Sequence, residues 1–185
     1  MEYIHVKMIR NNLDNLLDYP IPDGYFIRNL KKGDEYRWAE IETAAGEFKD
    51  IEFALNRFEK EFGQYLDEME KRCYFIDTDK GRSIGTATAW YNKDFRDGKY
   101  GRLHWVGIHK DFQGKKLGKP LVSAVMKNMA QFHNKTYLTT QTISIVAIKI
   151  YLDFGYEPLL TSNNCQRAWH LIAKELNHAE LRKYL

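Results

Sequence analysis

The sequence contains little cysteine, and its apolar residues form no long uninterrupted run. The two cysteines, Cys73 and Cys165, have no Cys or His at metal-ligand spacing, so neither a disulfide framework nor a metal site is indicated. The first ten residues lack the apolar core of a signal peptide, and Lys149 interrupts the most apolar stretch, Ile143 to Leu152. We therefore expect a cytoplasmic protein with reduced cysteines and no membrane partner.

An excess of charge of one sign is also missing. The chain has 28 basic and 25 acidic residues, a formal net charge of +3, and no block of basic residues. A surface that binds nucleic acid needs such a block to neutralise phosphates. Nucleic acid is therefore not expected as a partner, and the sequence leaves open whether the chain forms a homodimer.

The composition is that of a globular protein. The 185 residues are 44% hydrophobic and 14% aromatic, which is enough to build one substantial core. Residues 11–24 are rich in Asn, Asp and Pro, which favour turns. We therefore expect a lead-in segment over residues 1–24 and a single domain over residues 25–185.

The order of helix and strand signals defines the class of fold. Apolar residues at three- and four-residue spacing predict helices over 33–46, 50–69, 117–132, 147–154 and 163–176. Runs of β-prone residues predict strands over 25–29, 73–76, 84–91, 103–108 and 137–140. A polar turn with a glycine joins the second strand to the third, so these two form an antiparallel hairpin. The whole pattern predicts an α/β (α+β) protein in which helices cover a mixed sheet.

The segment from His109 to Lys119 joins a predicted strand to a predicted helix. It contains Gln113, two glycines and several lysines, and Pro120 then fits the first helical turn. Such a corner directs backbone N–H groups and a helix N-terminus at one point, which suits a pyrophosphate. A solvated loop with lysines for solubility explains the same residues, so the segment alone leaves both interpretations open.

These residues resemble the acetyl-CoA motif of the GNAT superfamily, Q/R-x-x-G-x-G/A, with Gln113 at its first position and Gly118 at its last. The resemblance implies a mostly antiparallel central sheet flanked by helices, acetyl-CoA as co-substrate, and a turn whose backbone holds the CoA pyrophosphate. It also implies that the preceding strand pairs with the pantetheine arm. The middle glycine of the pattern is Lys116 here, and Lys is unfavourable if that position needs a positive φ.

The segment from Ser144 to Pro158 resembles the second GNAT signature, N-x-x-A-x-x-x-Y-x-x-x-G-F-x-P. Ala147, Tyr151 and Gly155 match it, whereas Ser144 replaces the usual Asn. In the family the matching tyrosine lies near the cofactor sulfur, so the resemblance implies that Tyr151 protonates the departing thiolate. A buried core tyrosine is the alternative. From the two signatures together we expect the cofactor to contact Val106, Gly107, Ile108, Gln113, Gly114, Lys115, Lys116, Leu117, Gly118, Lys119, Ser144 and Tyr151.

An N-acetyltransferase also needs a group that takes a proton from the attacking amine. By strand alternation, Arg102, His104, Val106 and Ile108 share one face of the predicted strand. His104 is similar in placement to the histidine that arylalkylamine N-acetyltransferases use for this purpose, and its ordinary pKa suits the task. A strand histidine bonded to a neighbour is the alternative.

Glu47, between the first two helices, is a second candidate base, because this connection borders the acceptor site in GNAT proteins; a solvated loop carboxylate explains it equally. Glu40 and Glu42 are expected on the helix surface. Four aromatic residues are candidates for lining an acceptor pocket, although ordinary sheet packing explains them: Trp90, Tyr91, Phe95 and Trp105.

Three functions are compatible with these residues. The first is transfer of an acetyl group from acetyl-CoA to a small-molecule or peptide amine, by direct attack and without a metal. The second is a non-catalytic acyl-CoA-binding module, which Lys116 and Ser144 at two signature positions favour. The third is an interaction protein that keeps only the fold, and Gln113, Gly118 and Tyr151 argue against it.

Overall fold

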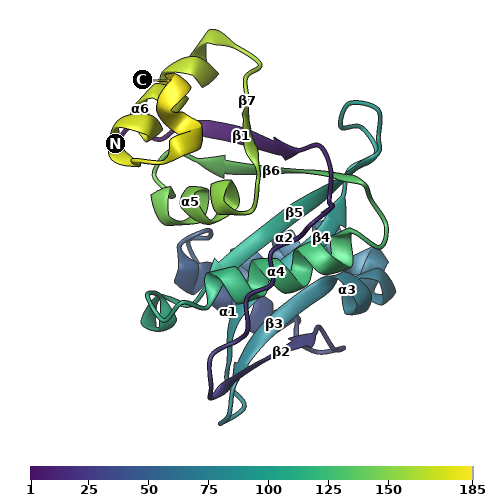
Figure 1. Ribbon diagram of the computed structural model, residues 1–185. Helices are drawn as coiled ribbons and strands as arrows, with labels where there is room; N and C mark the ends of the chain where they lie inside the picture. Colours follow the sequence, from purple (N-terminus) through teal and green to yellow (C-terminus); the bar gives the residue numbers. More distant parts are fainter. Residues whose placement is uncertain (185) are drawn as a thin grey trace. The chain divides into compact units, whose positions relative to one another are not determined.

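The computed structural model describes residues 1–184, the side chain of Asn163 excepted, and the chain divides into two compact units (Figure 1). Unit 1 comprises Met1–Asn15, Asn92–Arg102 and His133–Leu185, and unit 2 comprises Leu16–Tyr91 and Leu103–Phe132. The chain thus crosses between the units several times. The sequence did not indicate this division.

Unit 2 contains a sheet in which β2 (Tyr25–Asn29), β3 (Cys73–Thr78), β4 (Ser83–Tyr91) and the end of β5 (Tyr100–Ile108) follow one another. The pairs β2–β3 and β3–β4 are antiparallel. The hairpin that was predicted for 73–91 is therefore confirmed. The mixed, mostly antiparallel sheet with flanking helices is confirmed as well.

The helices of unit 2 are α1 (Glu35–Ala45), α2 (Ile51–Phe62), α3 (Leu66–Arg72) and α4 (Gly118–Met129). The single helix expected over 50–69 is interrupted by a short 3₁₀ turn, Gly63–Tyr65, so that prediction is wrong at its middle. A Cβ at Gly63 would meet the carboxyl of Glu59 one turn earlier, but this carboxyl ends an exposed, flexible side chain that can move away. Elsewhere the helices begin and end within a few residues of the predicted positions.

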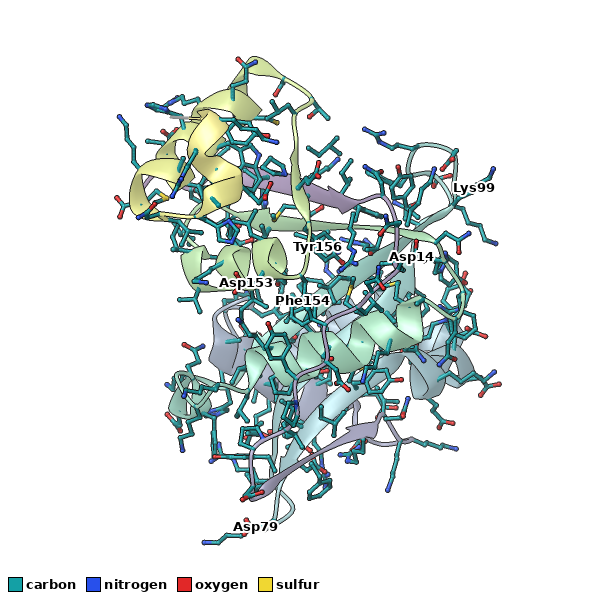
Figure 2. The ribbon with its side chains drawn as sticks, in the orientation of Figure 1. Asp14, Asp79, Lys99, Asp153, Phe154 and Tyr156 are labelled. Carbon is teal, nitrogen blue, oxygen red and sulfur yellow. The ribbon has the colours of Figure 1, made fainter. Side chains whose placement is uncertain are left out.

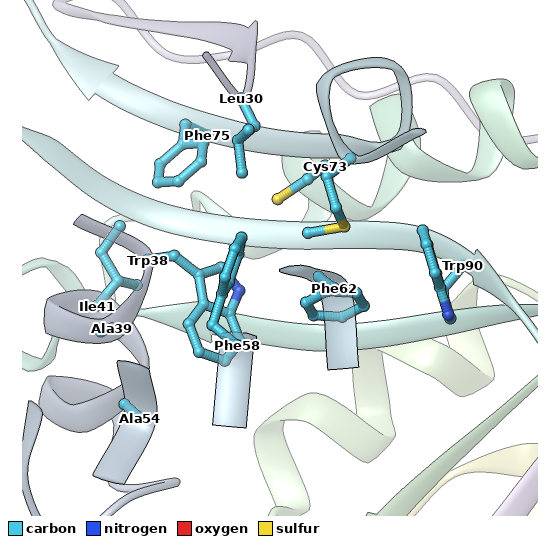
Figure 3. Packing of buried hydrophobic residues seen from close by; sticks show 11 residues of the cluster. Leu30, Trp38, Ala39, Ile41, Ala54, Phe58, Phe62, Cys73, Phe75 and Trp90 are labelled. Atoms are coloured by element: carbon cyan, nitrogen blue, oxygen red, sulfur yellow. The ribbon is translucent and has the colours of Figure 1, made fainter. Parts of the chain in front are cut away.

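An aromatic cluster fills the space between α1, α2 and the sheet of unit 2 (Figure 3). Trp38 of α1 lies at its centre, with ring centroids 5.2 Å from Phe58 and 6.3 Å from Phe62. Both contacts are edge-on, which is the favoured geometry for buried rings. The cluster fixes α1 and α2 against β3, β4 and β5, and so positions the strand that leads to the predicted phosphate turn.

Unit 1 contains the strands β1 (His5–Arg10), β6 (Lys135–Gln141) and β7 (Glu157–Leu159), together with the start of β5. β1 lies between β6 and β7 and is antiparallel to both, while β5 is parallel to β6. Regular structure therefore begins at His5 and not at Tyr25, which corrects the expected lead-in. Val6 and Met8 are buried while His5 and Lys7 are exposed, but one short alternation of this kind is a weak signal.

The helices of unit 1 are α5 (Ile145–Asp153) and α6 (Asn163–Glu175), and a 3₁₀ segment, Ala179–Tyr184, follows them. Arg10, at the end of β1, donates to the backbone carbonyl oxygens of Phe154 at 2.5 Å and Asp14 at 2.7 Å. Figure 2 shows Phe154 and Asp14 in this part of unit 1. The guanidinium group thereby joins the end of α5 to the chain that leaves β1. Among the described residues, no helix is both long and apolar enough to span a bilayer.

Candidate active site

The segment between β5 and α4 has the predicted strand–turn–helix form. After Ile108 the chain makes a 3₁₀ turn over Lys110–Phe112 and then an exposed stretch from Gln113 to Lys116. The side-chain amide of Gln113 donates to the carbonyl oxygen of Ile108 at 3.1 Å. Gln113 thus holds the turn against the end of the strand, which is a role in shaping the turn that needs no direct ligand contact.

The N-terminus of α4 closes this turn. Leu117, the residue before the helix, is buried and makes no side-chain cap, and the first turn carries no acidic residue. The first N–H groups of an α-helix have no acceptor within the helix, and they carry the positive end of its dipole. Gly118 places no side chain over them. With Lys115, Lys116 and Lys119 in the same turn, the corner fits a pyrophosphate group.

Lys116 adopts the left-handed conformation, with φ of 61°, and Gly114 does so with φ of 77°. The glycine of the family pattern is therefore replaced at a position where the backbone has a positive φ. A residue with a Cβ pays roughly 1–2 kcal/mol for this conformation. The turn adopts this conformation in spite of the strain, and the role that the motif implies for its backbone N–H groups stays a prediction.

Strand β5 is irregular at Trp105, whose φ is 47°. Neighbouring residues of a regular strand point to opposite faces, yet His104 and Trp105 both hydrogen-bond the carboxylate of Glu61 in α2, at 2.5 Å and 3.1 Å. Gly107 faces α1 on the same side, because a Cβ there would lie 2.8 Å from Glu42. The prediction that His104 shares a face with Val106 and Ile108 is therefore wrong, since the left-handed residue shifts the alternation by one.

The candidate base His104 is buried, and its Nε2 is paired with Glu61. A carboxylate beside an imidazole stabilises the protonated ring, so the pair has the chemistry of a proton acceptor. The pairing also matches the alternative interpretation, a strand histidine bonded to a neighbour. Glu47, the second candidate, is exposed in the loop after α1.

Glu42 contradicts the expectation that it lies on the helix surface. Its side chain is fully buried, and among the described residues neither carboxyl oxygen has a hydrogen-bond partner. Burial raises the pKa of the Glu42 carboxyl well above its usual value, and the negative charge of Glu47 raises it further. A glutamate on a helix does not by itself indicate burial. The sequence signal that Glu42 faces the core is its i, i+4 spacing from Trp38.

Ser144 and Tyr151 belong to unit 1. Ser144 precedes α5 without making a side-chain cap, and Tyr151 is 6% exposed, with its ring centroid 6.1 Å from that of Tyr156. Tyr156 donates to or accepts from Thr136 at 3.2 Å, and burial raises its pKa. Tyr151 is therefore buried beside a second tyrosine within its unit, and its part in the chemistry stays a prediction.

The four aromatic residues considered for an acceptor pocket divide between the units. In unit 2, Trp105 joins the cluster around Trp38 at 5.6 Å, and Trp90 stacks on Tyr91 at 5.1 Å. In unit 1, Phe95 stacks on Tyr137 at 3.7 Å. Each makes an ordinary packing contact. Trp105 lies beside His104 and donates to Glu61, and Trp90 belongs to the same cluster through Phe62, at 5.0 Å.

Comparison with known proteins identifies the family of the chain. The model of the acetyltransferase (GNAT) family matches residues 34–156, which include α1, the phosphate turn and α5. The chain therefore belongs to the GNAT acetyltransferase family. A search of curated proteins found no match.

Solved structures share the fold at low sequence identity. A GCN5-related N-acetyltransferase from Sphaerobacter thermophilus is 17% identical with a TM-score of 0.65, over 84% of this chain and 48% of that one. A GNAT-family acetyltransferase from Colwellia psychrerythraea is 11% identical with a TM-score of 0.64, over 85% of this chain and 54% of that one. A putative acetyltransferase from Pyrococcus horikoshii is 17% identical with a TM-score of 0.60, over 77% and 46%. The chain spans about half the length of these three structures.

Proposed function

We propose that the chain transfers an acetyl group from acetyl-CoA to a primary amine of a small molecule or peptide. The corner at residues 108–119 carries the proposal, because it combines a left-handed turn, the uncapped N-terminus of α4 and four lysines. Membership of the GNAT family supports acyl transfer as the class of reaction. A cytoplasmic location belongs to the same proposal.

The reaction that these residues support is direct attack. Acetyl-CoA, when bound, supplies an activated thioester carbonyl. Backbone N–H groups of β5 at Val106 to Ile108 hold and polarise this carbonyl, the amine gives its proton to a group of the protein, and the hydroxyl of Tyr151 protonates the departing thiolate. No covalent intermediate on the protein is needed.

The first test is calorimetric titration with acetyl-CoA. We expect binding by the wild-type chain and none by Gly118→Trp, because an indole at the first position of α4 would cover the N–H groups that hold the phosphates. Lys60→Trp is the control, since it places the same side chain at an exposed position of α2. Equal binding by Gly118→Trp and the control would refute the placement of the cofactor.

Tyr151→Phe tests the proposed acid. We expect unchanged affinity for acetyl-CoA and a loss of turnover of about 100-fold, the lower end of what a general acid contributes. The ring and its packing against Tyr156 stay in place in this variant, so a change in folding would not account for the loss. Unchanged turnover would remove Tyr151 from the mechanism.

A non-catalytic acyl-CoA-binding module is the second candidate. Two replacements favour this function. Lys116 stands at a glycine position of the cofactor motif and has a strained backbone, and Ser144 stands at the position of an asparagine. This function predicts that acetyl-CoA binds and that no amine is acetylated. Release of CoA thiol with any member of a broad panel of primary amines would exclude it.

A further inference from the structure

Helix α1 places a carboxyl group in the interior of unit 2 without a partner. Glu42 is fully buried, and both of its carboxyl oxygens lack a hydrogen bond among the described residues. Trp38, one helical turn earlier on the same face, is also fully buried, and its indole N–H lacks an acceptor. Buried polar groups in folded proteins are normally satisfied, so two unsatisfied groups side by side on one helix indicate a place where a polar ligand binds.

The carboxyl lies against the strand that leads into the phosphate turn. A Cβ built at Gly107 would be 2.8 Å from Oε1 and 3.2 Å from Oε2 of Glu42. The absence of a side chain at Gly107 is therefore what allows both oxygens to approach the backbone of β5. Gly107 is two residues beyond Trp105, whose left-handed conformation directs its ring to the same side.

Aromatic rings lead from this carboxyl toward the surface. Trp38 contacts Trp105 at 5.6 Å and Phe48 at 5.8 Å, and both of these rings are partly buried. Phe48 in turn contacts Phe53, which is 49% exposed. Aromatic faces attract ammonium groups, and a carboxylate at the end of such a row completes a site for a cationic amine with an apolar body.

Two other carboxyl groups lie in the same region, and both are occupied or exposed. Glu61 is bonded to His104 and Trp105, and Glu47 is exposed in the loop after α1. Glu42 differs from both because it is buried and free of hydrogen bonds among the described residues. A carboxyl in this state pairs with an ammonium group by losing its own proton, without first breaking a hydrogen bond to another described residue.

We propose that Glu42 is the group that takes the proton from the acceptor amine, and that Trp38, Phe48 and Trp105 hold the amine beside it. This inference rests on the proposed acetyl transfer. The ammonium group of the bound amine first gives one proton to the Glu42 carboxylate, and the neutral nitrogen then attacks the acetyl carbon. The carbon–sulfur bond breaks, its electron pair leaves with the CoA sulfur, and the sulfur receives the proton of Tyr151. The second proton lost by the nitrogen restores the hydroxyl of Tyr151, and Glu42 releases its proton to water.

The groups that affect the ionisation of Glu42 come from several elements. Glu47, in the loop after α1, raises its pKa by its negative charge, and Cys73 of β3 interacts with it electrostatically. The His104–Glu61 pair lies on the same side of β5. His104 is therefore the group whose contribution must be separated from that of Glu42.

The experiment compares wild type, Glu42→Gln, His104→Gln and Glu40→Gln, the last as a control on the same helix. Acetyl transfer is measured between pH 6 and 9 with 2-phenylethylamine, putrescine, glucosamine and a peptide with a free N-terminus, and acetyl-CoA binding is measured by calorimetry. We expect kcat/KM of Glu42→Gln to fall about 100-fold or more, with unchanged affinity for acetyl-CoA. The residual rate should rise about tenfold per pH unit, because the free amine must then come from solution.

A second measurement does not depend on turnover. Binding of 2-phenylethylamine is measured by calorimetry in two buffers of different ionisation enthalpy, with 2-phenylethanol as the neutral control. Wild type should release a proton as the ammonium group pairs with Glu42, and Glu42→Gln should bind more weakly and release none. The neutral alcohol should show no proton release with either protein.

The outcomes separate the two proposals. If wild type binds acetyl-CoA but acetylates none of the amines, the proposed function fails, and the role of Glu42 in proton transfer fails with it. If wild type is active and Glu42→Gln keeps its rate and pH profile, the role of Glu42 alone is refuted. A large loss in His104→Gln with none in Glu42→Gln would assign the proton to the His104–Glu61 pair.

Discussion

The phosphate turn and the layer between α1 and β5 belong to the same unit, but they offer a ligand opposite surroundings. In the turn, Gln113 to Lys116 are exposed, and the groups available to a ligand are backbone N–H groups and lysines in contact with water. Between α1 and β5, Glu42 and Trp38 are fully buried and carry polar atoms without partners. An altered side chain in the exposed turn can extend into water. An altered side chain in the closely packed layer must displace its neighbours. Substitutions should therefore have larger effects in the buried layer.

The largest effect on stability is expected for Gly107→Ala. The new Cβ would lie 2.8 Å from a carboxyl oxygen of Glu42, so this fully buried side chain would have to shift. Overpacking of this kind costs about 1–3 kcal/mol. The free energy of unfolding in urea should fall by that amount.

The double variant with Glu42→Ala is the control for this contact. Removing the carboxyl makes space for the methyl group, so Gly107→Ala should destabilise the Glu42→Ala background by less than half as much. Equal destabilisation in both backgrounds would mean that Gly107 is needed for another reason. The contact between Glu42 of α1 and Gly107 of β5 would then not explain why stability is more sensitive to substitution in this layer than in the turn.

Glu42→Gln should change the pH dependence of stability. The folded state raises the pKa of Glu42 above its unfolded value, so above the unfolded pKa the folded protein holds a proton that the unfolded chain has lost. The contribution of Glu42 to the stability of the wild type is fully present below its unfolded pKa. It is lost as the pH rises from there toward the folded pKa. The stability of Glu42→Gln relative to wild type should therefore increase from pH 5 to pH 8.

Urea unfolding at pH 5, 6.5 and 8 measures this difference, with Glu40→Gln as the reference on the same helix. Glu40→Gln should follow the wild-type curve at all three pH values. A constant difference between Glu42→Gln and wild type would show that the Glu42 carboxyl titrates alike in the folded and unfolded chains. It would also remove the reason to regard the layer as a poised site for proton transfer.

The fold could be predicted where its signals are local. Helical spacing and the polar turn after β3 placed the helices and the hairpin, because each depends on neighbours in sequence. The strands β1 and β7 were missed: β7 has only three residues, and β1 is defined by pairing with residues far away in the chain. Pairing of this kind leaves little trace in the sequence of either strand.

The candidate site divides in the same way. The turn between β5 and α4 could be predicted from Gln113 and Gly118, because the backbone of a turn is shaped by its own residues; its binding of phosphate stays a prediction. The left-handed conformation of Trp105 could not be predicted, since a tryptophan adopts that conformation only where tertiary packing imposes it. The close approach of Glu42 to the strand likewise depends on Gly107, a residue far away in the sequence. The residues around Glu42 do not indicate this contact.

The smallest effect is expected in the turn, for Lys116→Gly. Glycine adopts the φ of 61° found at Lys116 without a steric penalty, but it also gains entropy in the unfolded chain, so the net gain in unfolding free energy should be about 0.5–1 kcal/mol. Lys116→Ala, the control, removes the charge but keeps the Cβ, and should give no gain. If both variants stabilise equally, repulsion among the lysines is the cause and not the backbone. Acetyl-CoA affinity should change little in Lys116→Gly, because the backbone N–H groups of the turn are retained.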